Sequence, residues 1–74
     1  MTQQIHQALT ILRRKQVEIR TGLSRSTIYA RIAEGLFPQP IDLGGRAVGW
    51  LEAEIDAWLQ SRIDASRKTA KRGA

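Results

Sequence analysis

Between positions 25 and 31 of the segment TGLSRSTIYARIAEG, residues 21–35, lie five side chains that can form hydrogen bonds or ion pairs. Hydroxyl and guanidinium groups donate to phosphate oxygens and to acceptor atoms on base edges, and arginine can donate two parallel hydrogen bonds to guanine. Such residues early in a helix are typical of a helix that enters the major groove of DNA. For Arg25 and Ser26, an ordinary solvated helix face is the alternative. The five candidates are Arg25, Ser26, Thr27, Tyr29 and Arg31.

The residues around these side chains predict how they are positioned. A first helix is expected over residues 14–21, and Gly22 ends it in the left-handed conformation that glycine adopts easily. Ser24 is a typical N-cap for a second helix, since its hydroxyl can accept a hydrogen bond from a backbone amide of the first turn. Ile28 and Ile32 are four residues apart, so they lie on one face and anchor this helix to a core.

The glycines at positions 44 and 45 predict a β-hairpin, because both positions of a primed two-residue turn need a positive φ. Arg46 follows at the tip, where it contacts a phosphate or the minor groove, or is simply an exposed turn residue. The register expected from this tip would bring Ile41, Leu43, Val48 and Trp50 to one face of the sheet. In that register Leu43 pairs with Arg46, Asp42 with Ala47, Ile41 with Val48, and Gln39 with Trp50.

Two more elements complete the predicted domain. Residues 10–13 can form a short strand at a sheet edge, and the apolar residues between positions 51 and 63 recur at helical spacing, which predicts a third helix. Trp50 and Trp58 are expected in the core. The chain is thereby divided into a flexible N-terminal segment (1–9), a DNA-binding domain (10–64) and a disordered basic tail (65–74).

The sequence does not predict enzymatic chemistry, a metal or another cofactor. It has no cysteine, and its single histidine, His6, cannot complete a metal site. Glu52, Glu54 and Asp56 are spread over different faces of their helix, where the helix dipole accounts for them better than a catalytic role does. No apolar run approaches the ~20 residues of a membrane span, and a signal peptide pattern is missing. We therefore expect a soluble, cytoplasmic protein associated with the nucleoid.

Positive charge is concentrated in two parts of the chain. The net charge is +5, and it divides into +4 for residues 13–46, −3 for residues 52–56 and +4 from residue 62 onward. Basic residues that gather in this way are typical of a surface that binds the phosphate backbone, although ordinary solubilising charge is an alternative. Lys15 in the first region and Lys68 in the last are candidate phosphate contacts.

Four motifs resemble, in their order, the AlpA-like phage and prophage regulators, a branch of the excisionase and MerR-like winged-helix group. The motifs are TGLSRSTIY, GLFPQP, LGGRAVGW and EIDAWL, within residues 11–63. The resemblance implies a mainly α fold with a small β-hairpin, that is, a winged helix-turn-helix. It implies that a helix over about residues 24–34 enters the major groove and that the hairpin around residues 44–46 is the wing. By the same resemblance the contacts to DNA are Arg25, Ser26, Thr27, Tyr29 and Arg31 from the helix, and Arg46 from the wing.

These observations predict a sequence-specific protein that binds double-stranded DNA and belongs to a phage or mobile element. It would act as a transcriptional regulator or as an excisionase-type architectural factor. Because a chain of 74 residues offers a small interface, we expect two or more copies on half-sites about 10 bp apart.

Two alternatives remain open at this point. One is a protein-interaction module that displays Tyr29 and Arg31 to an integrase or RNA polymerase, with DNA binding secondary. The other is a general binder of RNA or single strands, which is weaker because only Tyr29 and Phe37 could be exposed for base stacking.

Overall fold

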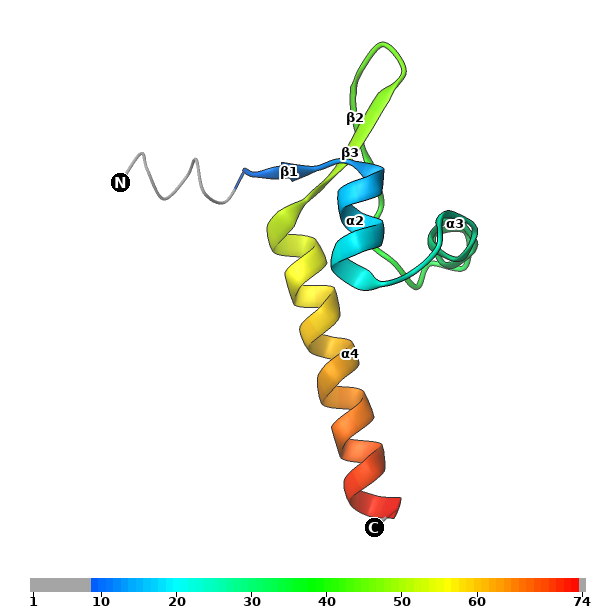
Figure 1. Cartoon of the computed structure of the whole chain (residues 1–74), viewed down its shortest axis with the longest axis vertical. Helices are drawn as coiled ribbons and strands as arrows, with labels where there is room; N and C mark the ends of the chain where they lie inside the picture. The colour runs from blue at the N-terminus through cyan, green and yellow to red at the C-terminus, as the bar shows by residue number, and fades with distance from the viewer. Residues whose placement is uncertain (1–8, 74) are drawn as a thin grey trace, which may run out of the picture.

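The fold is mainly helical, with a small three-stranded antiparallel sheet (Figure 1). The structure is a computed structural model that describes residues 9–73, with side chains through Lys68. Residues 1–8 of the predicted flexible segment 1–9 lie outside the described residues, and His6 is among them. The elements are β1 (Ile11–Leu12), α2 (Arg14–Thr21), α3 (Arg25–Ala33), β2 (Ile41–Gly44), β3 (Ala47–Leu51) and α4 (Glu52–Gly73).

The corner between α2 and α3 forms as the sequence predicts. Gly22 has a φ of +76° and its amide donates to the Glu18 carbonyl at 2.7 Å, which ends α2. Ser24 caps α3, because its hydroxyl accepts a hydrogen bond from the Thr27 amide at 3.2 Å. Ile28 is fully buried, so the predicted anchor of α3 is confirmed, while Ile32 packs half-buried at the edge of the core.

The sheet has the order β1-β3-β2. The strand predicted near residues 10–13 is confirmed as β1, in which Ile11 pairs with Leu51 and Leu12 with Trp50. β3 is therefore the central strand: it pairs with β1 on one side and with β2, the other strand of the hairpin, on the other side. It leads directly into α4. This arrangement places the start of α2 beside the hairpin.

The predicted register of the hairpin is wrong by one residue. Gly44 is the last residue of β2 and the turn is Gly45-Arg46, so Leu43 becomes an unpaired, bulged residue. The observed pairs are Ile41 with Gly49, Asp42 with Val48, and Gly44 with Ala47.

The new register is accompanied by a local hydrogen bond and has a consequence for the two sheet faces. The Asp42 carboxylate accepts from the Gly44 amide at 2.9 Å, and Gly44 takes a φ of +99° that only glycine adopts readily. Because directly opposed residues share a face, Ile41 lies on the face of Gly49, opposite to Trp50. The predicted clustering of four apolar residues on one face is therefore wrong.

The core lies where the two short helices, the sheet and the start of α4 meet. Trp50 is fully buried, as predicted, and its indole nitrogen donates to the Pro38 carbonyl at 3.0 Å. Trp58 is half-buried at the rim, where it packs edge-on against Phe37 with ring centroids 4.7 Å apart. The fully or nearly buried side chains are Leu12, Val17, Ile28, Phe37, Trp50 and Ile55.

The third predicted helix is longer than expected. α4 begins at Glu52 and continues through Gly73, and its C-terminal half projects away from the sheet and from α2 (Figure 1). The tail predicted to be disordered from residue 65 is therefore helical up to residue 73. The helix can continue because residues 60–72 contain neither proline nor glycine to stop it.

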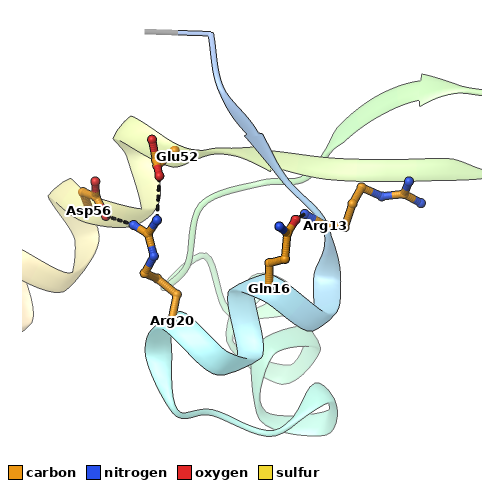
Figure 2. A network of polar contacts seen from close by, with 5 residues as sticks. All are labelled: Arg13, Gln16, Arg20, Glu52 and Asp56. Atoms are coloured by element: carbon orange, nitrogen blue, oxygen red, sulfur yellow. Dashed lines mark hydrogen bonds and ion pairs between the residues drawn. The ribbon is translucent and has the colours of Figure 1, made fainter. Parts of the chain in front are cut away.

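One ion-pair network fixes α4 to α2. Arg20 donates to the Asp56 carboxylate at 2.7 Å and to the Glu52 carboxylate at 2.5 Å (Figure 2). The hydrogen bond to Glu52 is the largest cause that raises the pKa of Arg20 above its ordinary value. The carboxylates at the start of α4 thus hold two elements together, in addition to their position at the positive end of the helix dipole.

Candidate nucleic-acid interface

The exposed flank of α3 begins at its N-terminal turn. Arg25 and Ser26 are the first two residues of the helix and both are exposed. Tyr29 lies one turn further, 38% exposed, and the Arg25 guanidinium lies over its ring at 5.7 Å from the centroid. Three of the predicted contact residues therefore form one continuous surface, with hydrogen-bonding groups at the end of the helix that carries positive partial charge.

The other two predicted residues on α3 lie elsewhere. Arg31 is exposed, but it comes two positions after Tyr29 and so points about 160° away around the helix axis. Thr27 is half-buried, and its hydroxyl accepts a hydrogen bond from the Ser24 hydroxyl at 3.0 Å. The structure thus separates Arg31 from the Arg25 surface and ties Thr27 to the helix cap.

A surface pocket lies between the start of α2, the middle of α3 and the hairpin. Four of the side chains around it are basic, and one is the Tyr29 ring that also contacts Arg25. The pocket is lined by Arg13, Arg14, Lys15, Tyr29, Arg46 and Val48. It brings together Lys15, Tyr29 and Arg46, which the sequence had suggested separately from three different elements.

Arg13 is the best-fixed cation of this pocket. Its Nε donates to the Val48 carbonyl of β3 at 2.9 Å, and its backbone amide donates to the Gln16 side chain at 2.8 Å. Figure 2 shows its guanidinium extending away from the Arg20 network. Because Nε is used by Val48, the two terminal nitrogens of the guanidinium are left to face a ligand.

The charges around the pocket are not balanced. Arg14 forms an ion pair with Glu18 at 2.5 Å. Arg13, Lys15 and Arg46 have no ion-pair partner within residues 9–68, and none of the six lining residues is acidic. Unpaired cations that face one hollow raise the local potential and attract an anion. The arrangement is chemically suited to bind a phosphate group.

Arg13 and Arg14 were not predicted as site residues, and Lys68 lies apart from the others. The signal for the two arginines was the run Arg13-Arg14-Lys15 at the start of the first helix, of which only the charge and Lys15 entered the prediction. Lys68 is exposed on α4, 16 residues beyond its first residue and thus about 24 Å along the helix axis. The structure does not bring it into contact with the pocket or with α3.

Metal ions and membranes are two other partners that side chains and helices can bind. Within residues 9–73 there is no group of three or more histidine, aspartate or glutamate residues arranged to hold a metal ion. None of the helices in this range is both long and apolar enough to cross a membrane.

Comparison with known proteins agrees with the order of motifs in the sequence. Residues 10–63 match the family described as prophage CP4-57 regulatory protein (AlpA). The chain is 43% identical over 61 residues to the DNA-binding transcriptional activator AlpA of Escherichia coli K12, covering 74% of this chain and 87% of that protein. It is 55% identical over 47 residues to the uncharacterized protein ORF88 of Enterobacteria phage P4. That match covers 64% of this chain and 52% of the phage protein, so the chain spans about half of its length.

Proposed function

The chain belongs to the AlpA family of prophage regulatory proteins, and from this we propose that it is a sequence-specific DNA-binding transcriptional regulator of a phage or mobile element. Its partner is double-stranded DNA, it acts without enzymatic chemistry or a cofactor, and it works in the cytoplasm at the nucleoid. The observation that carries the proposal is the position of Tyr29. This residue belongs both to the exposed flank of α3 and to the basic pocket, so groups suited to bases and groups suited to phosphates form one surface.

The proposed mechanism is that of a winged helix-turn-helix. The first turn of α3 enters the major groove, where Arg25 and Ser26 contact base edges, and each good contact contributes about 1–3 kcal/mol of discrimination. The β2–β3 hairpin is the wing, with Arg46 at its turn. Arg31, on the other side of α3, contacts the flanking backbone instead of the same bases, and the Thr27 hydroxyl, which accepts a hydrogen bond from Ser24, can donate its own proton there.

The small size of the chain bears on how many copies bind the DNA. A single small recognition module buries only roughly 600–1,000 Å² of protein surface, which limits its specificity. We therefore propose two or more copies on half-sites about 10 bp apart. Transcription activation is the role named for the Escherichia coli relative, and an excisionase-type architectural role would use the same interface. The alternative, contact with an integrase or RNA polymerase through Tyr29 and Arg31, would use two side chains that point in nearly opposite directions around α3.

The proposal is tested by comparing one basic residue on α3 with one on α4. A duplex enriched from a random library by the wild-type chain serves as the selected site, and its scrambled version serves as the reference. Arg25→Ala should abolish most of the preference for the selected duplex. Lys68→Ala should weaken binding to both duplexes equally and reduce the slope of log K against log salt by about 1. If the two variants changed the preference equally, α3 would not be the reading element.

A further inference from the structure

We propose that the basic pocket between α2, α3 and the hairpin binds a single phosphate group of the DNA backbone, with Arg13 as its principal ligand. The inference rests on the proposed function, because its ligand is part of the DNA that α3 reads. It assigns a role to Arg13, which belongs neither to the reading turn of α3 nor to the hairpin turn.

Arg13 is held in position before any ligand arrives. Its amide is bound to Gln16 and its Nε to the Val48 carbonyl, two partners on different elements. A guanidinium fixed in this way loses little side-chain freedom on binding, and its remaining nitrogens form a planar fork that matches two phosphate oxygens. Arg13 also connects the start of α2 to β3, so a phosphate bound here would stabilise the position of the hairpin relative to the helices.

Two further cations from different elements complete the ligand set. Lys15 comes from the first turn of α2, and Arg46 comes from the hairpin turn. Neither forms an ion pair in the part of the chain that the structure describes, so neither must give up a carboxylate to bind. Arg14, in contrast, is held by Glu18 and contributes less net charge. The pocket also lies at the N-terminal end of α2, where the helix dipole favours an anion.

The position of the pocket indicates a phosphate within a strand of DNA. Arg13, Lys15 and Arg46 are all exposed, so the pocket is open to a group whose chain enters on one side and leaves on the other. Tyr29 forms the wall shared with Arg25. A phosphate at this wall would lie directly beside the groove that α3 enters, and it would fix the depth and register of the helix on the base pairs.

The test removes single charges from both partners. Each phosphate of the selected duplex is replaced in turn by an uncharged methylphosphonate, and binding is measured for the wild type, Arg13→Gln, Lys15→Gln and Arg46→Gln, with Lys68→Gln as the matched control. Substitution at one position should weaken wild-type binding about tenfold and weaken the three pocket variants by less than about twofold. At the same position Lys68→Gln should still lose about tenfold. The Lys15 side chain forms no hydrogen bond or ion pair within residues 9–68, so Lys15→Gln tests the pocket without removing a side-chain contact of the fold.

Each other outcome has a defined meaning. The three pocket variants could become insensitive to methylphosphonate at different positions, or at no position. If the preference for the selected duplex persisted in that case, the single-phosphate site would be wrong and the proposed function would stand. If the wild type does not prefer the selected duplex, both proposals fail. Inorganic phosphate is titrated into the DNA-free chain as a further arm. If inorganic phosphate saturated the chain at a concentration too low to affect DNA binding as a salt, the pocket would be assigned to free phosphate instead.

Discussion

The guanidinium carbon of Arg25 lies 5.7 Å from the centroid of the Tyr29 ring, one helical turn along α3. An arginine over an aromatic face is attracted by the ring quadrupole, and residues four apart on a helix are close enough to keep this contact. The Tyr29 ring therefore restricts the conformations of Arg25 before the protein meets DNA. On the proposed function, this makes Tyr29 a positioning residue for base recognition.

We predict that Tyr29→Leu reduces the preference for the selected duplex about twofold to fivefold, because an exposed cation–π contact contributes about 0.5–1 kcal/mol. Tyr29→Phe keeps the ring and is the matched control, and it should retain the preference. The measurement is the ratio of Kd values for the selected and scrambled duplexes at one salt concentration. Equal losses for the two variants would show that the hydroxyl group matters and the ring contact does not.

The helical part of the site could be predicted from the sequence because its signals are local. Gly22 and Ser24 form their hydrogen bonds with residues no more than four positions away. Ile28 marks the face of α3 that is buried. Arg13 could not be identified in this way. Its position depends on the Val48 carbonyl, 35 residues later, and no local pattern specifies that contact.

The hairpin register was missed for a similar reason. Two neighbouring glycines fit a turn at 44–45 as well as one at 45–46, so the turn pattern alone does not decide between them. The sheet decides, because Gly49 lies under side chains from both neighbouring strands. A Cβ atom at this position would be 2.5 Å from Cγ2 of Ile11 and 3.2 Å from Cδ1 of Leu43. In the observed register the Leu43 side chain lies over Gly49, where there is no Cβ atom to meet.

This packing predicts that Gly49→Ala destabilises the fold. The added methyl group would also be 3.1 Å from the Leu12 carbonyl, which belongs to the backbone and cannot move away easily. Overpacking of this kind costs about 1–3 kcal/mol in the free energy of unfolding, measured by chemical denaturation. Ile11→Ala in the same chain should recover part of the loss. Additive effects of Gly49→Ala and Ile11→Ala would contradict the predicted clash.

The Arg20 network predicts a salt-dependent contribution to stability. Arg20→Gln should lower the free energy of unfolding, and the difference from the wild type should shrink as the salt concentration rises, since exposed pairs are screened. Glu52→Gln should cost more than Asp56→Asn, because Glu52 has the larger effect on the pKa of Arg20 and is the less exposed of the two carboxylates. A reversed order would show that the geometry in Figure 2 does not persist in solution.

The pH dependence of this contribution has a defined sign. The pKa of Arg20 is raised in the folded state, so the stabilisation is fully present below the pKa of the unfolded chain and is lost only as the pH rises through the folded value. That range lies far above neutrality. The difference in unfolding free energy between the wild type and Arg20→Gln should therefore show no change caused by Arg20 titration between about pH 6 and 9.

The last prediction concerns the end of α4. Leu59 is the last residue of this helix that packs against the core, and Ile63 is already 40% exposed, so the helix beyond it gains little from burial. A chain that ends at Asp64 should therefore unfold at nearly the same denaturant concentration as the full chain. It lacks four basic residues, and its binding to selected and scrambled duplexes should weaken equally, with a smaller salt slope. A change in the preference between the two duplexes would instead place the end of α4 in sequence recognition. A large loss of stability would show that residues beyond Asp64 belong to the folded domain.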